Sequence, residues 1–411
     1  MSSALVRSRR LQPICDGRGR EYVMVRMRCR EEPAPLGEPM GECIVSLRGW
    51  HPALAMAELS ALFPNGNVRP LSSPRLAQID GEKNAAEFSI SAGIEAVFTN
   101  GVHIKWSGHE DLLDNVDQYL EHNSHEGGSC AVHAWKHGQG IDGCSRTKLA
   151  GNIGGLLSRM DATIDLENPD TTFGLLLDEH SQTVTFGWLL NHGPTGDSST
   201  ERRASQRPFF KPVSLEPRLA RLAVNLACGP LSNGACLDPM TGTGGFTIEA
   251  VLSGRGAVGI DLDQGMIEGA KANLAWSGSD SNPFVYGDAT DIQSVLSENA
   301  IDTFAGVVLD PPYGRNSQGS IDHQELLNKT LSSAMEVVHG GLALILPTEH
   351  RSQVLTRPLE TYERPALKHT SWESIEGMLN ETGWVYKNAW YVSVHGSLGR
   401  VIVYATNAPR G

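Results

Sequence analysis

The sequence predicts an α/β protein whose C-terminal half forms a doubly wound parallel sheet. From Gly234 onward, short apolar runs alternate with helical stretches, which is the order expected for parallel strands joined by crossover helices. Acidic residues follow four of these runs, and a glycine-rich turn follows the first of them. The predicted strands are 235–238, 257–261, 283–287, 307–310 and 343–346.

Further elements are predicted around this sheet. A helix over 217–227 leads into it, and a helix over 265–275 connects two of its strands. Two late strands, 384–394 and 400–404, flank a glycine-bounded turn. We therefore expect an antiparallel hairpin at one edge of the sheet.

The chain before the sheet divides by composition. Residues 1–40 combine basic and proline-rich stretches and are expected to be a poorly ordered extension. Residues 41–190 are predicted to form an N-terminal α/β region, within which 129–190 make a small unit of short strands and one helix. A Gly/Pro/Ser-rich linker is expected at 191–213, and residues 214–411 make up the C-terminal domain.

Composition narrows the class of protein. The 411 residues contain no run of about 18 uncharged apolar residues that a membrane helix needs, and residues 1–30 lack the apolar core of a signal peptide. Seven scattered cysteines without a C-x-x-C argue against a disulfide scaffold. We expect a cytoplasmic protein that has no membrane partner and acts as a monomer, with an accessory subunit left open.

Four residues have spacings that would allow a zinc site, namely Cys130, His133, His137 and Cys144. The segment 130–135 reads as a strand, however, and successive side chains of a strand point to opposite faces. Cys130 and His133 would then face apart, so we predict no metal site.

A net charge of −13 is unusual for a nucleic-acid binder, but the charge is unevenly distributed. Residues 1–30 carry eight arginines against two acids. A second basic patch begins in the linker, where Arg202, Arg203, Arg207 and Lys211 are candidate contacts to RNA phosphates. Taken singly, each of these side chains is equally well explained as an ordinary exposed residue.

The first strand of the parallel sheet ends in a loop that suits a nucleotide-like cofactor. Its sequence over 238–245, Asp-Pro-Met-Thr-Gly-Thr-Gly-Gly, places glycines where a ligand approaches the backbone at a helix N-terminus. An initial acid suits a ligand that carries an amino group and a sulfonium, as S-adenosylmethionine does. The candidate cofactor contacts in this loop are Asp238, Thr241, Gly242, Thr243 and Gly244.

Acids at three more strand ends complete the predicted crevice. Asp261 suits the two ribose hydroxyls, and Asp288 with Ala289 suits the adenine amine. Asp310 opens the sequence Asp-Pro-Pro-Tyr, in which two prolines fix a carboxylate, a carbonyl and an aromatic ring after a buried strand. Any single acid could be a helix cap, but four acids at one edge favour a ligand site. Asp310 is therefore also a candidate cofactor contact.

These motifs resemble those of S-adenosylmethionine-dependent methyltransferases that modify exocyclic amino groups, and residues 234–350 carry the resemblance. Residues 129–190 are similar to a THUMP domain, an RNA-binding module of tRNA-modifying enzymes. The segments 49–52 and 207–225 resemble parts of the archaeal tRNA guanine-N2 methyltransferases that modify position 10. Met240-Thr241 departs from the aromatic residue and cysteine that many members carry.

The resemblance implies a Rossmann-like domain that transfers one or two methyl groups from S-adenosylmethionine to N2 of guanine 10 in tRNA. The catalytic residues that it implies are Asp310, Pro311, Pro312 and Tyr313. Asp310 and the Pro311 carbonyl would accept the two N–H groups of the amine, and Tyr313 would stack on the base. Whether Asp310 acts as a base or only as an acceptor is left open.

Two other functions are weighed. Adenine-N6 methylation of RNA or DNA could use the same Asp-Pro-Pro-Tyr sequence, although enzymes that act on DNA lack a THUMP domain. A non-catalytic RNA-binding partner that retains the fold is disfavoured by the four intact acids.

Overall fold

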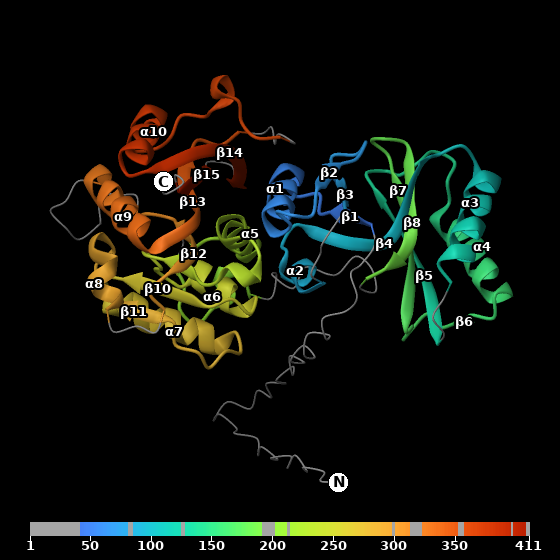
Figure 1. Ribbon diagram of the computed structural model, residues 1–411, viewed down its shortest axis with the longest axis horizontal. Coiled ribbons are helices and arrows are strands. Elements are labelled where there is room, and N and C mark those ends of the chain that lie inside the picture. Colours follow the sequence, from blue (N-terminus) through green and yellow to red (C-terminus); the bar gives the residue numbers. More distant parts are fainter. Residues whose placement is uncertain are drawn as a thin grey trace, which may run out of the picture. The chain divides into compact units, whose positions relative to one another are not determined.

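The computed structural model describes residues 42–80, 85–124, 128–190, 202–211, 214–297, 301–312, 323–351, 357–395 and 398–407. The predicted extension over 1–40, the first part of the linker and Tyr313 lie outside these residues. Two sheets organise the described chain, one of eight strands and one of seven (Figure 1).

The eight-stranded sheet combines two halves of the N-terminal region, in the order β2-β3-β1-β4-β8-β7-β5-β6. The halves join where β4 pairs antiparallel with β8. The strands are β1 (Cys43–Leu47), β2 (Val68–Pro70), β3 (Leu76–Ile79), β4 (Ile94–Lys105), β5 (Ser129–His137), β6 (Thr163–Ile164), β7 (Thr171–Asp178) and β8 (Thr183–Leu189). The helices are α1 (Pro52–Leu62), α2 (Ala85–Ile90), α3 (His109–His122) and α4 (Arg146–Arg159).

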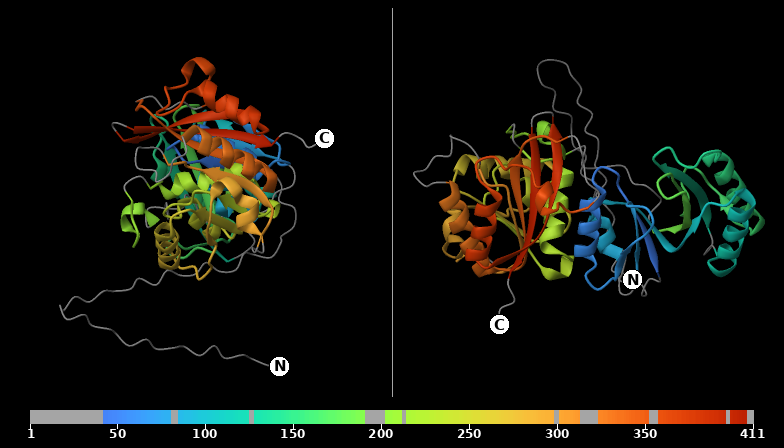
Figure 2. Two further views of the ribbon diagram at one scale, coloured as in Figure 1. Left: turned by 90° about the vertical axis from the view of Figure 1, so that its left-hand side faces the viewer. Right: turned by 90° about the horizontal axis from the view of Figure 1, so that it is seen from above.

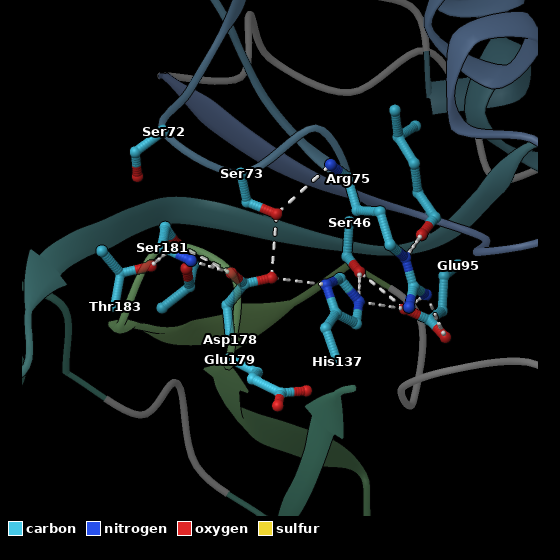
Figure 3. Close-up of polar contacts among 12 residues, drawn as sticks. Ser46, Ser72, Ser73, Arg75, Glu95, His137, Asp178, Glu179, Ser181 and Thr183 are labelled. Carbon is cyan, nitrogen blue, oxygen red and sulfur yellow. Dashed lines mark hydrogen bonds and ion pairs between the residues drawn. The ribbon is translucent and has the colours of Figure 1, made fainter. Parts of the chain in front are cut away.

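A buried polar network connects the two halves of this sheet (Figure 3). His137 of β5 lies between two carboxylates, with Nε2 2.9 Å from Oε2 of Glu95 on β4 and Nδ1 3.2 Å from Oδ2 of Asp178 on β7. The hydroxyls of Ser46 and Ser73 donate to Glu95 and Asp178. Because buried polar groups are costly when they lack partners, these hydrogen bonds fix how the two halves meet.

The seven-stranded sheet is mixed, with the order β11-β10-β9-β12-β13-β15-β14. The first five strands of this order are parallel, and β15 is antiparallel to both of its neighbours. These pairings confirm the α/β class. The strands are β9 (Cys236–Asp238), β10 (Ala257–Asp261), β11 (Phe284–Tyr286), β12 (Phe304–Leu309), β13 (Val338–Thr348), β14 (Trp384–His395) and β15 (Leu398–Asn407).

Helices cover both faces of this sheet (Figure 2). Apolar residues of α5 and α6 pack with Val308 and Ile345 on one face, and those of α8, α9 and α10 pack with Val307 and Leu344 on the other. This alternation follows from the two-residue period of a strand. The helices are α5 (Pro217–Cys228), α6 (Gly245–Leu252), α7 (Gln264–Trp276), α8 (Ile292–Leu296), α9 (His323–Val337) and α10 (Trp372–Glu381).

Helix α5 approaches the sheet unusually closely because glycines lie beneath it. A Cβ on Gly306 of β12 would lie 2.4 Å from the carbonyl oxygen of Ala227, and a Cβ on Gly341 of β13 would lie 2.8 Å from the same atom. Only a residue without a side chain fits at either position. This close packing places α5 directly over the strands that lead to the crevice.

The opposite side of α5 contacts the N-terminal region through a buried carboxylate. Glu58 of α1 is fully buried and accepts hydrogen bonds from Ser91 Oγ and from the backbone N–H groups of Ala92 and Gly93. The side-chain amide of Asn225 donates to Glu58 Oε1 at 2.7 Å and to the carbonyl of Ile90 at 2.9 Å. These bonds compensate the burial of Glu58.

Replacement of Asn225 by alanine should lower the free energy of unfolding by about 1–3 kcal/mol, because the buried Glu58 carboxylate loses a donor. Urea denaturation followed by tryptophan fluorescence measures the loss. Asn233→Ala is the control, since its part-buried amide donates only to the carbonyl of Cys228 and should contribute about 0.5 kcal/mol. Equal losses in both variants would contradict the assignment.

Candidate active site

Four acidic residues meet at the carboxyl-terminal edge of the parallel strands. Asp238 ends β9 and Asp261 ends β10, while Asp288 and Asp310 follow β11 and β12. Because β11, β10, β9 and β12 are neighbours in one parallel sheet, these strand ends line a single edge. Ligands of open α/β sheets bind in a crevice outside this edge.

Asp238 is almost fully buried, and only one of its oxygens is hydrogen-bonded within the described chain. Oδ2 accepts from the hydroxyls of Thr241 at 2.8 Å and Thr247 at 2.9 Å, whereas Oδ1 has no partner there. Burial raises the pKa of Asp238 to about 7, against the lowering effect of the two threonines. A buried carboxylate oxygen without a partner is where a cationic ligand group would bind.

The turn after β9 has the backbone shape that the glycines predict. Gly242 and Gly244 have φ values of 51° and 83°, in the left-handed region that favours glycine. The N–H of Gly242 donates to Asp261 Oδ2 at 2.9 Å, which connects the turn to the end of β10. Thr243 is buried, and its hydroxyl lies 3.1 Å from that of Ser214.

Asp261 and Asp288 keep acceptor capacity toward the crevice. The oxygens of Asp261 accept from the N–H groups of Gly242 and Asp263, and burial raises the pKa of this carboxyl. Oδ1 of Asp288 accepts from the N–H and hydroxyl of Thr290, while Ala289 beside it is buried. Each carboxylate oxygen has two lone pairs, so these bonds leave room for ligand hydroxyl and amino groups.

Asp310 follows β12 and contacts an arginine from a distant part of the sequence. Nη1 of Arg400, on β15, lies 3.4 Å from Asp310 Oδ2. Burial raises the pKa of Asp310, and the positive charge of Arg400 opposes this shift. Pro311 is buried and Pro312 is exposed, while Tyr313 lies outside the described residues.

The four basic residues of the linker have different surroundings. Arg202 donates to both oxygens of the buried Glu249 on α6, at 2.9 and 3.1 Å, and Arg221 of α5 also donates to Glu249. Arg207 is buried, and its Nε donates to the carbonyl of Arg202. Arg203 and Lys211 are exposed. The linker is thus attached to the C-terminal domain through the pair of Arg202 and Glu249.

Three residues that hydrogen-bond or pair with residues of the site are not predicted from the sequence. Thr247 orients Asp238, Arg400 pairs with Asp310, and Asn273 of α7 donates to the carbonyls of Phe209 and Thr243 at 2.9 and 3.0 Å. Only Thr247, one turn into the helix after the glycine loop, is near a motif in sequence. The other two depend on tertiary pairing, which leaves no local signal.

The cysteine and histidine cluster weighed as a zinc site has other contacts. Cys130 is buried, and His137 lies between Glu95 and Asp178. Within the described ranges, no three His, Cys, Asp or Glu side chains are arranged to hold a metal ion.

His137 and Asp178 also form a Ser-His-Asp series with Ser46, whose Oγ lies 3.1 Å from His137 Nε2 (Figure 3). A nucleophile must reach its substrate, and Ser46 is 0% exposed and donates to Glu95. The series therefore connects strands and is not a hydrolytic site.

S-adenosylmethionine fits the crevice by the chemistry of its groups. The unpartnered Asp238 Oδ1 suits its ammonium, the left-handed glycine turn allows close approach of its methionine part, and Asp261 suits its ribose hydroxyls. Asp310 follows β12, the strand next to β9 in the sheet. The fold and this crevice define a Rossmann-like methyltransferase domain.

Comparison with known proteins agrees with this class. Residues 204–366 match the RMKL-like methyltransferase domain family. The tRNA (guanine(10)-N2)-dimethyltransferase of Pyrococcus abyssi is 35% identical over 197 residues, 48% of this chain and 57% of the relative. That of Methanothermobacter thermautotrophicus is 32% identical over 57% of this chain and 65% of the relative. Thus the chain spans less than two thirds of these two relatives.

A third relative is covered more fully. The protein of Methanothermococcus thermolithotrophicus named "Probable tRNA (guanine(10)-N2)-dimethyltransferase" is 34% identical over 114 residues, 27% of this chain and 69% of the relative. Among solved structures, that of TrmN from Thermus thermophilus covers 89% of this chain and 99% of its own, with 19% identity and a TM-score of 0.44. On the sequence matches, the chain belongs to the archaeal tRNA guanine-N2 methyltransferase family.

Affinity for S-adenosylmethionine should increase about tenfold per pH unit between about pH 5.5 and pH 7, as measured by calorimetric titration. Asp238 holds a proton below its pKa of about 7, and binding of the ammonium requires that this proton be released. Asp238→Asn should bind more weakly and lose the pH dependence that Asp238 causes. If both proteins showed the same slope, Asp238 would not be the ammonium ligand.

Proposed function

We propose that this chain transfers one or two methyl groups from S-adenosylmethionine to N2 of guanine 10 in tRNA. The observation that carries the proposal is the position of Asp310, which follows the strand next to β9 and so lies beside the cofactor turn and Asp238. Family membership supports guanine in tRNA as the substrate.

The proposed chemistry is an in-line attack of the guanine amine on the sulfonium methyl group. The lone pair of this amine is delocalised into the ring, so the free amine is a weak nucleophile. Asp310 and the Pro311 carbonyl would accept its two N–H bonds, which directs the lone pair toward the methyl group. Orientation is the largest contribution that the site would supply, since effective molarities reach about 10⁵ M or more.

Proton removal and base access complete the proposed mechanism. The methylated amine must lose a proton, and Asp310 is the acceptor within reach. Guanine 10 is paired in a helical stem, so the base would leave the stack to enter the crevice, where Tyr313 would stack on it. Pro311 and Pro312 would limit the backbone freedom of the segment that presents these groups.

RNA binding is assigned to the N-terminal region and the linker. The unit of β5, α4, β6, β7 and β8 over residues 129–190 is proposed as a THUMP domain that recognises tRNA by shape and phosphate contacts. Of the four basic linker residues, Arg203 and Lys211 are favoured as direct phosphate contacts because they are exposed. Arg202 and Arg207 would instead hold the linker in place.

The proposed location is the cytoplasm, where tRNA is the substrate, and the proposed active form is a monomer. In the described part of the chain no helix has the length and apolarity needed to cross a membrane.

The proposal is tested by incubating the protein with S-adenosylmethionine and unmodified tRNA, then identifying the methylated nucleoside and its position by mass spectrometry. We expect N2-methylated or N2,N2-dimethylated guanosine at position 10. Asp310→Ala should lower the rate at least 10²-fold, about the contribution of a proton acceptor, and leave cofactor affinity within about twofold.

Asp302→Ala is the matched control for Asp310→Ala, since this exposed acid precedes the other end of β12. Its rate should equal that of the wild type. Methylated adenosine as the product would support adenine-N6 methylation instead, and loss of cofactor binding in Asp310→Ala would indicate a structural role for that residue.

Binding of tRNA should weaken with salt, and the double variant Arg203→Ala/Lys211→Ala should reduce the slope of log K against log[salt] by about 2, one for each lost phosphate contact. Filter binding over a series of salt concentrations measures the slope. Lys329→Ala, on the face of the sheet opposite α5, is the control and should keep the wild-type slope. A wild-type affinity independent of salt would refute the phosphate contacts.

A further inference from the structure

We propose that Arg400 is a positioning residue for methyl transfer, because its guanidinium holds the Asp310 carboxylate in the orientation that leaves the second oxygen available to the acceptor amine. This inference rests on the proposed function, in which Asp310 accepts from the guanine amine. Arg400 would act through Asp310 and would not touch the reacting atoms.

The contact engages one oxygen of Asp310 and leaves the other open. Arg400 Nη1 lies 3.4 Å from Oδ2, whereas Oδ1 has no hydrogen-bond partner in the described parts of the chain. The Arg400 side chain is 10% exposed and that of Asp310 is 27% exposed. The arginine therefore approaches from the protein interior, and the carboxylate keeps its solvent-facing side for a ligand.

The strand register explains how a residue so late in the sequence reaches Asp310. Arg400 lies near the start of β15, which is antiparallel to β13, so this start falls at the carboxyl-terminal edge of the parallel strands. β13 separates β15 from β12, and two strand spacings amount to about 10 Å. The long arginine side chain crosses most of this distance.

Asp310 and Arg400 also project from the same face of the seven-stranded sheet. Val308 and Ile402 belong to the same core cluster beneath α5. Side chains two residues apart on a strand share a face, so Asp310 and Arg400 continue the rows of Val308 and Ile402. Both side chains therefore leave their strands on the face that α5 covers.

The backbone around Arg400 is fixed on both sides. Arg400 pairs with Pro347 on β13 and with Val392 on β14. The preceding Gly399 lies under Tyr391, since a Cβ there would be 2.4 Å from Cε2 of that ring. The Tyr391 hydroxyl in turn donates to the carbonyl of Arg351 at 3.0 Å. A guanidinium on so rigid a support can define the orientation of its partner.

The charge of Arg400 matters as well as its position. Burial favours the neutral form of Asp310, and a neutral carboxyl would donate a hydrogen bond from one oxygen where the amine needs an acceptor. Among the described residues, the other charged and titratable side chains near this edge include Asp238, Asp261 and Asp288 in the crevice and Glu349, His350 and Arg351 after β13. They are unchanged in a variant of Arg400.

The test compares Arg400→Met and Arg400→Lys with the wild type in the tRNA assay, from about pH 5.5 to about pH 9. In Arg400→Met we expect kcat to fall about 10- to 100-fold, as for a misplaced catalytic group, with cofactor affinity unchanged. The acid limb of the pH profile should move up by about one pH unit or more, because the carboxylate has lost its cation. Arg400→Lys retains the charge and should keep the acid limb near that of the wild type.

Arg364→Met is the matched control, because Arg364 is 9% exposed and its guanidinium pairs at 2.7 Å with Glu376 of α10, not with an acid of the crevice. It should keep the wild-type pH profile even if it lowers stability. If Arg400→Met fails to fold, Arg400→Gln takes its place, with the same expectations. The inference is overturned by an unchanged kcat, or by a lower kcat without a shift of the acid limb. An inactive wild type would instead overturn the proposed function, and this inference with it.

Discussion

Parallel pairing of β10, β9, β12 and β13 is the constraint on which the crevice depends. It brings strand ends that are separated by up to about seventy residues of chain onto one edge, where Asp238, Asp261 and Asp310 lie together. Without this pairing, each acid would be an isolated cap or turn residue. The N–H of Gly242, in the turn after β9, donates to Asp261 at the end of β10, so this hydrogen bond joins two neighbouring strand ends directly.

Helix α5 connects the parallel sheet to the N-terminal region and to α6. Beneath it, Gly306 and Gly341 allow the backbone of Ala227 to contact the sheet. On its other sides, Asn225 bonds the buried Glu58 of α1, and Arg221 bonds the buried Glu249 of α6. Buried carboxylates are stable only with such donors, so the same helix fixes the sheet, the N-terminal region and the linker.

Much of the fold could be predicted because its signals are local. The bounds of β10, Ala257–Asp261, are those predicted from its apolar run. Helix α3 has a local signal that the sequence prediction did not use, since its buried residues Leu112, Val116, Tyr119 and Leu120 recur at helical spacing. The full length of β4 is less predictable, because the Asn100-Gly101 pair within it is typical of a turn, and there Asn100 has a positive φ and the pairing with β8 shifts in register.

The candidate site also contains residues that the sequence predicts and contacts that it does not. Asp238, Asp261 and Asp310 stand next to turn motifs, so the sequence indicates their place at the edge. The Arg400 contact depends on β15 running antiparallel beside β13, and the attachment of Arg202 depends on a glutamate 47 residues away. Neither contact leaves a local pattern in the sequence. Both depend on the tertiary arrangement of strands and helices.

Asn273 connects the glycine turn after β9, which contains Thr243, to the linker. Its amide nitrogen donates to the carbonyls of Phe209 in the linker and of Thr243 in the turn, and its oxygen accepts from the N–H of Phe209. A ligand that displaces the linker must therefore shift or break bonds that shape the turn. Such coupling is reciprocal: if RNA binds the linker as proposed and changes cofactor affinity by some factor, the cofactor changes RNA affinity by the same factor.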